Sequence, residues 1–154
     1  MIGPTGFPLI VGAARRMRAA SFLIDGEAVI CRPAGISDFE ALRGCRSGTA
    51  DATLVDFDLI ELQGNDLRND KPITRKQTLA RMLSDNSTDN AIVYNEHLEH
   101  DGALVFDHAC RMGLEGIVSK RLDAPYRSGP SKVGLKSKNP LSEAVRREWE
   151  KDWG

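Results

Sequence analysis

Apolar residues recur along the chain with two different periods, and the change from one period to the other marks the expected elements. Between Pro8 and Met17 the apolar positions have helical spacing, and a proline suits the first turn of a helix. Residues 74–85 have the same period, and Thr74 followed three positions later by Gln77 is a typical capping signal. Further helices are expected at residues 37–44, at 102–112 with Asp101 as the cap and Gly113 as the end, and after Pro140.

Segments rich in β-branched and aromatic residues lie between these helices and predict strands. The first, residues 21–32, contains Asp25-Gly26, a favoured two-residue turn, so this segment is either one strand or a hairpin. The other expected strands are residues 52–62, 91–98, 115–121 and 133–139. Strands and helices are interspersed and the connections are short, which favours antiparallel or mixed sheets. The pattern predicts an α+β fold in one domain.

Composition limits the classes of protein that remain. The 154 residues are 41% hydrophobic and 28% charged, which is typical of a globular chain, and the net charge of −1 argues against a histone-like polycation. Three cysteines without C-x-x-C spacing indicate reduced thiols rather than a disulfide frame or a zinc site. No apolar run approaches a membrane span, and the N-terminus lacks the order of a signal peptide. We expect a cytoplasmic protein without a membrane partner.

Charge is unevenly distributed along the chain. Residues 51–70 hold six acids and one arginine, whereas residues 119–138 hold six lysines and arginines and one acid, Asp123. An anionic ligand would bind the second segment, and a phosphate is the natural candidate. The alternative is a lysine-rich hairpin that is simply solvated.

Two lysines and two glutamates give this segment a more specific chemistry. Lys136 and Lys138 are two positions apart in a strand, so their side chains share a face and repel each other unless an anion lies between them. Glu27 and Glu115 are each embedded in apolar, strand-like sequence, where a carboxylate without a partner is unfavourable. Either glutamate alone could pair with a lysine. Together with the lysines, they indicate a divalent metal and a phosphate chain. The sequence contains neither a G-x-x-x-x-G-K-[ST] loop nor a G-x-G-x-x-G motif, so this is not a P-loop or Rossmann site.

Four segments in order resemble motifs of one enzyme family. DGEAV (25–29), FDLIELQGNDLRNDKPITRK (57–76), EGIVSKR (115–121) and GLKSKNP (134–140) resemble motifs III, IIIa, IV and V of ATP-dependent DNA ligases, in the type associated with bacterial end joining. The resemblance covers roughly residues 7 to 153. It implies an ATP-grasp-like nucleotidyltransferase (adenylation) domain, partial over residues 1–154, with antiparallel or mixed sheets flanked by helices. As a departure from many relatives, we expect no OB-fold domain in this sequence.

The resemblance also implies a reaction and roles for particular residues. In the family, a motif I lysine attacks ATP to give lysyl-AMP, AMP moves to the 5′-phosphate of nicked double-stranded DNA, and the 3′-hydroxyl then displaces it, with magnesium as the metal, in DNA repair and recombination. By position, Glu27 resembles the glutamate near the ribose and the metal, and Glu115 the other metal-binding glutamate. Phe57 resembles the aromatic residue that stacks on adenine. Lys136 and Lys138 resemble the lysines on the α-phosphate, and Lys120 would lie nearby.

Departures from the family pattern leave three interpretations open. No K-x-D-G motif is present, and none of the 24 residues before Asp25 is lysine, so no residue is assigned as the nucleophile and we expect the chain to begin partway through the domain. Gly134 stands where the family usually has tryptophan. The chain is then a ligase domain that is defective alone, or a non-catalytic remnant that binds nucleotide or DNA phosphate, or a fragment completed by a partner chain that supplies motif I.

Overall fold

The computed structural model describes residues 6–30, 51–86, 88–127, 134–142 and 145–146. The chain divides into two compact units, Met1–Glu96 and His97–Gly154, and each is described by itself.

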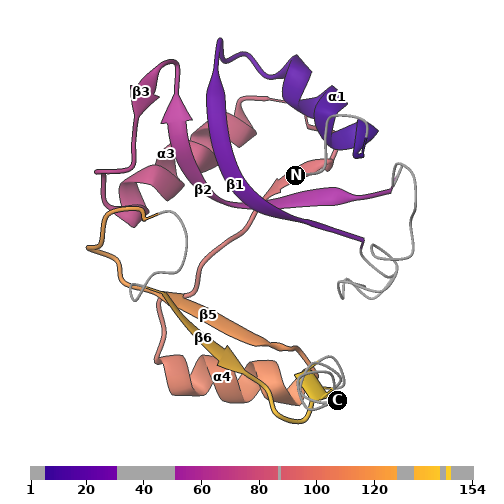
Figure 1. The fold of residues 1–154 in the computed structure, drawn as a ribbon, viewed down its shortest axis with the longest axis vertical. Helices are drawn as coiled ribbons and strands as arrows, with labels where there is room; N and C mark the ends of the chain where they lie inside the picture. The colour runs from indigo at the N-terminus through magenta and orange to yellow at the C-terminus, as the bar shows by residue number, and fades with distance from the viewer. Residues whose placement is uncertain (1–5, 31–50, 87, 128–133, 143–144, 147–154) are drawn as a thin grey trace, which may run out of the picture. The chain divides into compact units, whose positions relative to one another are not determined.

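The first unit contains a four-stranded mixed sheet with two helices (Figure 1). Strand β1 pairs antiparallel with β2, and β2 pairs antiparallel with β3 and parallel with β4. Its elements are α1 (Pro8–Arg16), β1 (Phe22–Val29), β2 (Thr53–Leu62), β3 (Asn65–Asp66), α3 (Pro72–Ser84) and β4 (Ile92–Tyr94). The expected strand at 91–98 is therefore real but shorter, because β4 ends at Tyr94.

Both helices bury their apolar faces against β2 and β4. Leu59 of β2, Leu79 of α3 and Ile92 of β4 are the largest apolar side chains that are fully buried. Ala13, within α1, and Met17, just beyond its end, complete the same cluster. This core fixes β2 on one side and so positions the residues at the middle of that strand.

The Asp25-Gly26 pair is not a turn, and β1 is a single strand. Two irregularities interrupt its register with β2, because Leu23 pairs with Glu61 but Ile24 with Leu59, and Asp25 pairs with Asp58 but Gly26 with Asp56. The register therefore skips Ile60 and Phe57 of β2, which are the extra residues of two β-bulges. Gly26 is required at its position, since a Cβ there would lie 2.8 Å from the carbonyl oxygen of Val55.

Helix α3 begins three residues earlier than the capping signal at Thr74 predicts. Lys71 is the N-cap residue, without a side-chain hydrogen bond to the helix, and Pro72 occupies the first turn. Thr74 lies inside the helix, where its carbonyl accepts a hydrogen bond from the hydroxyl of Thr78 at 3.0 Å. The capping box at Thr74 and Gln77 is wrong, because proline already fixes a helical φ at the first position and has no N–H to be capped.

The second unit contains α4 (Gly102–Arg111) and an antiparallel pair of strands, β5 (Gly116–Lys120) and β6 (Gly134–Lys138) (Figure 1). Asp101 caps α4 as predicted, since its Oδ1 accepts from Ala103 N at 3.0 Å and Leu104 N at 3.1 Å. Helix α4 packs on β5.

The α+β fold class with antiparallel and mixed sheets is confirmed. The helix expected at 37–44 lies outside the described residues, as does most of the helix expected after Pro140. Within the described residues, no helix is long and apolar enough to cross a membrane.

Candidate functional site

The β5–β6 hairpin places three of the predicted lysines on one face. In its register Lys138 lies opposite Gly116, Lys136 opposite Val118, and Lys120 opposite Gly134. Cross-strand partners share a face, and residues two apart in a strand do too, so Lys120, Lys136 and Lys138 point to the same side, about 7 Å apart along the strand. We call these three residues the lysine face. All three side chains are exposed.

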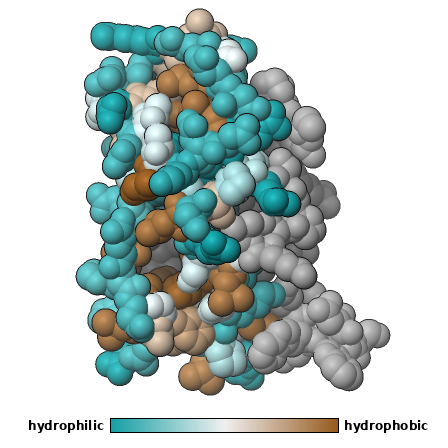
Figure 2. Space-filling model, turned by 90° about the vertical axis from the view of Figure 1, so that its left-hand side faces the viewer, coloured by the Kyte–Doolittle hydropathy of each residue, from teal (hydrophilic) through white to brown (hydrophobic). Residues whose placement is uncertain are grey.

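The surroundings of the lysine face are partly apolar. Val118 lies among the three lysines and is 58% exposed. Exposed apolar side chains also occur among hydrophilic ones on the side of the molecule shown in Figure 2. The neighbouring Arg121 is bound by Asp123, with a nitrogen–oxygen distance of 2.8 Å, so its charge is already balanced. The lysine face therefore suits a ligand that carries both anionic and apolar parts.

Neither predicted glutamate is buried. Glu27 lies in β1 opposite Val55 and is exposed, and Glu115 lies directly before β5 and is exposed. The inference of buried carboxylates from their apolar neighbours is wrong, because both side chains are exposed although the residues on either side of them are partly buried. Among the described residues neither side chain forms an ion pair, so their oxygens are accessible to a metal.

Phe57 lies at an unusual point of β2. The register with β1 skips it, and the register with β4 stops one residue earlier, at Asp56 opposite Tyr94. Its carbonyl instead accepts a hydrogen bond from the Lys76 ammonium of α3, at 3.5 Å. A β-bulge commonly redirects a side chain, and the predicted adenine-stacking residue lies at one.

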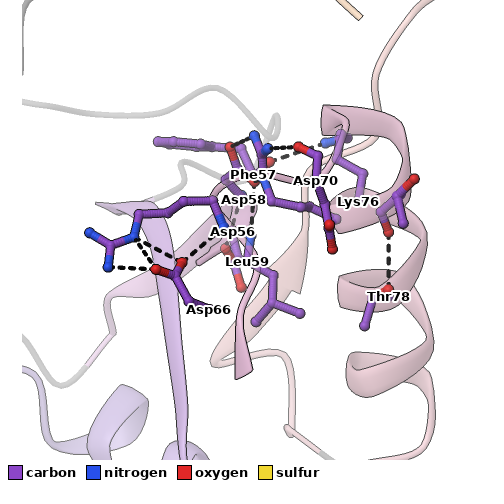
Figure 3. A network of polar contacts seen from close by, with 11 residues as sticks. Asp56, Phe57, Asp58, Leu59, Asp66, Asp70, Lys76 and Thr78 are labelled. Carbon is purple, nitrogen blue, oxygen red and sulfur yellow. Dashed lines mark hydrogen bonds and ion pairs between the residues drawn. The ribbon is translucent and has the colours of Figure 1, made fainter. Parts of the chain in front are cut away.

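A buried polar network surrounds this bulge (Figure 3). The Arg75 guanidinium donates two hydrogen bonds to Asp58, at 2.7 and 2.9 Å, and a third to the carbonyl of Asp70 at 2.5 Å. Arg75 and Asp58 are 2% and 3% exposed. This pair was not predicted from the sequence, although two acids two positions apart in an apolar strand, followed by Arg75-Lys76 in a helix, are a usable signal.

Asp56, two residues before Asp58, has no comparable partner. Its side chain is fully buried, its Oδ1 accepts only a long hydrogen bond of 3.4 Å from Asp58 N, and its Oδ2 has no hydrogen-bond partner in the described part of the chain. Burial, with the charges of Asp58 and Asp25 adding to it, raises the pKa of Asp56 to about 7.

One hollow of the first unit lies away from these residues. A cavity of about 460 Å³ is lined by Arg18, Leu62, Gln63, Arg81 and neighbouring residues, near the end of β2 and the last turn of α3. None of the predicted site residues lines it, so this cavity does not identify the site. Within the described residues, no group of three His, Cys, Asp or Glu side chains could hold a metal alone.

Comparison with known families gives one match over most of the chain. Residues 6–138 match the model of the ATP dependent DNA ligase domain. The multifunctional non-homologous end joining protein LigD of Pseudomonas aeruginosa is 32% identical over 122 residues, which are 78% of this chain and 14% of that protein. A probable DNA ligase of Dictyoglomus turgidum is 39% identical over 80 residues, 49% of this chain and 13% of that protein. The chain therefore spans only a small part of these relatives.

Solved structures agree with this match. The crystal structure of the ligase domain from Mycobacterium tuberculosis LigD superposes with a TM-score of 0.64 and 27% identity, over 76% of this chain and 38% of that one. Mycobacterial DNA ligase D complexed with ATP and MES gives a TM-score of 0.61 and 28% identity, with the same two coverages.

Proposed function

The chain belongs to the ATP-dependent DNA ligase family, in its bacterial end-joining, LigD-like type, and we propose that it is a nucleotidyltransferase segment that binds ATP with magnesium and serves the sealing of nicked double-stranded DNA. The observation that supports this most directly is the lysine face, because the motif V lysines expected on the α-phosphate share that face of β6 with Lys120 of β5.

We propose one role for each residue by its place in the family motifs. The Phe57 ring would stack on adenine, and Glu27 would contact the ribose. The ammonium groups of Lys136 and Lys138 would donate to α-phosphate oxygens, with Lys120 nearby. Ammonium groups placed there stabilise the negative charge that develops on the phosphate during transfer.

Magnesium fits this set of residues. It prefers hard oxygen ligands and commonly binds one or two carboxylates together with substrate phosphates and water. Glu27 and Glu115 would hold it, and both carboxylates are exposed and form no ion pair in the part of the chain that is described. When bound, the ion neutralises phosphate charge and so favours nucleophilic attack.

We also propose that these 154 residues do not adenylylate themselves. They contain no K-x-D-G motif, and the two motif V lysines would bind the α-phosphate rather than attack it in line. The absence of this motif also favours the second candidate function, a segment that binds nucleotide or DNA phosphate without turnover. A segment that carries the motif I lysine would complete the reaction.

Incubation with magnesium and α-labelled ATP, followed by denaturation, tests the chemistry. We expect no label to remain on the protein. A stable labelled band would contradict the proposed inactivity, since another lysine would then be the nucleophile.

Equilibrium binding of ATP tests the site. We expect the K136Q/K138Q variant to bind ATP at least about tenfold more weakly, because each hydrogen bond to a charged group contributes roughly 1.5–3 kcal/mol. Arg111→Gln is the matched control, since Arg111 is exposed and already paired with Asp107 at 2.8 Å. Equal losses in both variants would contradict a specific role of the lysine face.

A further inference from the structure

The hollow of about 460 Å³ in the first unit has no part in the site described above. Three separate pieces of the chain form its walls: the connection from α1 to β1, the end of β2 with the turn that follows it, and the last turns of α3. Because these pieces come together only by tertiary packing, the hollow is a feature of the folded unit and not of one local segment.

Hydrogen bonds fix the three walls to one another. Arg18 N donates to Asn86 Oδ1 at 2.7 Å, which joins the α1–β1 connection to the end of α3. Gln63 N donates to the carbonyl of Ser21 at 2.9 Å, which joins the end of β2 to the same connection. Asn86 is itself held, since its Nδ2 donates to the carbonyl of Met82 at 2.6 Å. The lining residues are therefore held by a fixed backbone, as a binding site requires.

Two arginines line the hollow from different walls. Arg18 belongs to the α1–β1 connection and Arg81 to the last turn of α3. Both are exposed, and within the described residues neither guanidinium forms a hydrogen bond or an ion pair, whereas that of the nearby Arg16 is paired with Asp89. The planar fork of arginine matches phosphate and carboxylate oxygens, so two such groups at one hollow indicate an anionic ligand.

The end of α3 offers another explanation, but only for one of the two arginines. The last turn of a helix carries partial negative charge, and a cation in that turn balances it. Arg81 fits this role. Arg18 does not, because it belongs to another segment and contacts the end of α3 through its backbone N–H rather than its guanidinium. A ligand accounts for both side chains.

The other lining residues limit the kind of anion. Asp85 also lines the hollow and forms no ion pair among the described residues, so two positive charges and one negative charge leave a net charge of +1. That charge suits a phosphodiester, which carries one negative charge, better than the more highly charged phosphates of ATP. Leu62 and Met82 supply an apolar part of the lining, against which the carbon atoms of a deoxyribose can pack, and the Gln63 amide can donate to a phosphate oxygen.

We propose that this hollow binds a backbone phosphate of double-stranded DNA, with the guanidinium groups of Arg18 and Arg81 donating to its oxygens. Leu62 and Met82 contact the neighbouring deoxyribose. The contact positions the duplex without reading its sequence, because every sequence has the same phosphates. The hollow belongs to the first unit and the lysine face to the second, so the chain has two anion sites with different ligands. This inference rests on the proposed function in one respect, namely that DNA is the substrate.

Fluorescence anisotropy of a labelled nicked duplex, over a range of salt concentrations, gives the first test. R18Q/R81Q should bind about threefold to tenfold more weakly, and its slope of log K against log salt should be smaller by at least about 0.9, the contribution of one neutralised phosphate. R16Q/R111Q is the matched control. It removes the same charge from two exposed arginines that are already paired, at 2.7 and 2.8 Å, and should keep the wild-type slope.

A variant of the opposite sign gives the second test. Asp85→Asn should bind the duplex about twofold to fivefold more tightly, because a like charge is removed from beside the phosphate. Asp66→Asn, which removes an exposed acid paired with Arg68 at 2.8 Å, should stay within about twofold of the wild type. R18K/R81K keeps both charges and should recover the salt slope but not the full affinity, since lysine lacks the planar fork.

Thermal unfolding shows that R18Q/R81Q is intact. It should melt close to the wild type, because the hydrogen bonds at Arg18 and Arg81 run through their backbone atoms, which the substitutions leave unchanged. A loss of DNA affinity in a protein of unchanged melting temperature then reports the missing guanidinium groups.

ATP binding of the same variants separates this proposal from the proposed function. R18Q/R81Q should bind ATP as the wild type does. If the chain failed to bind ATP while R18Q/R81Q still weakened DNA binding, the proposed nucleotide site would fail and the DNA contact would stand. The proposal is overturned if R18Q/R81Q and the wild type share one DNA affinity and one salt slope, if R16Q/R111Q loses as much, if R18Q/R81Q weakens only ATP binding, or if the wild type binds no DNA.

Discussion

Two carboxylates, Asp56 and Asp58, are only two residues apart in β2 yet lie in opposite electrostatic situations. Both are buried, but Asp58 receives the guanidinium of Arg75 and the amide of Leu59, whereas Asp56 receives only a long hydrogen bond. A buried charge is stable only with its partners, and of these two carboxylates only Asp58 accepts hydrogen bonds from a cation among the described residues. The free energy of unfolding therefore depends on the proton of Asp56 and on the hydrogen bonds between Asp58 and Arg75.

The first prediction concerns Asp56 and pH. Its pKa is 3.8 in the unfolded chain and about 7 in the folded one, so between these values the unfolded state binds fewer protons and stability falls as pH rises. The loss is complete above about pH 7. Asp56→Asn should therefore be more stable than the wild type at pH 8.5, by about 1–3 kcal/mol after the unsatisfied amide is counted, and not at pH 4. Urea unfolding at both pH values measures this, and a constant difference would contradict it.

The second prediction concerns Arg75. Arg75→Met leaves Asp58 buried without its cation and should lower the free energy of unfolding by about 3–5 kcal/mol. Arg68→Met is the control, because Arg68 and Asp66 are about half exposed, and there a loss of at most about 1 kcal/mol is expected. The free energy of unfolding is measured by urea denaturation. Similar losses in the two variants would show that burial does not increase the contribution of the Asp58–Arg75 pair to stability.

At the scale of elements, the β5–β6 pair depends on a glycine that both its backbone conformation and close packing require. Gly116 has φ +149°, and a Cβ on it would lie 2.0 Å from the carbonyl oxygen of Ser137 and 3.0 Å from the Cα of Lys138. Because Lys138 lies opposite Gly116, this glycine allows the two strands to approach at the point where the lysine face begins. The absence of a side chain at Gly116 therefore allows β5 to pair closely with β6, the strand that carries Lys136 and Lys138.

The third prediction follows from that contact. Gly116→Ala should destabilise the second unit by at least about 3 kcal/mol, since both the backbone conformation and the space oppose a side chain. Gly102→Ala provides the control. Nothing lies within 4 Å of the Cβ that would be added at the start of α4, so a gain of about 0.4–1 kcal/mol is expected there. Thermal unfolding followed by circular dichroism compares them, and an unaffected Gly116→Ala would disprove the close approach.

Helices and strands were predicted well where their periodicity agrees with the local chemistry. Features that depend on how one strand pairs with its neighbour were predicted poorly. The sequence predicts the Asp101 cap, the single long strand β2, and the position of Lys136 and Lys138 on one face of β6. The bulges at Ile60 and Phe57 do not, because an extra residue in one strand is defined only by its neighbour. The choice between a strand and a hairpin at Asp25-Gly26 was open for the same reason, and packing of Gly26 against Val55 decided it.

At the scale of the whole molecule, charge does not reveal the site. The net charge is −1, so any affinity for a polyanion depends on local groups such as the lysine face. The sequence predicted which lysines share a side, but it misjudged the burial of Glu27 and Glu115 and missed Lys76 and Arg75. Lys76 and Arg75 were missed for the same reason. A helix residue comes close to a strand only through tertiary packing, which the local sequence pattern does not show.

The fourth prediction concerns ligand-linked stability. If the chain binds magnesium and ATP, saturation to about 100 times the dissociation constant should raise the free energy of unfolding by about 2.7 kcal/mol and raise the melting temperature accordingly. K136Q/K138Q should lose this increase while melting close to the wild type without ATP, because both lysines are exposed. Arg111→Gln should keep the increase. If ATP raised the free energy of unfolding of K136Q/K138Q by the same amount, the nucleotide would bind at a site other than the lysine face.

The parallel pairing of β4 with β2 also has a consequence for synthesis on the ribosome. Leu54 and its partner Ile92 are 38 positions apart, with β3 and α3 between them. At about 5–20 residues per second, the edge of β2 stays uncovered for roughly 2–8 s of translation, long enough for an unpaired strand to meet another nascent chain. The residues that border Phe57 are thus the last of the first unit to find their strand partners, and a pause in translation within α3 would lengthen the interval in which the chain is prone to aggregate.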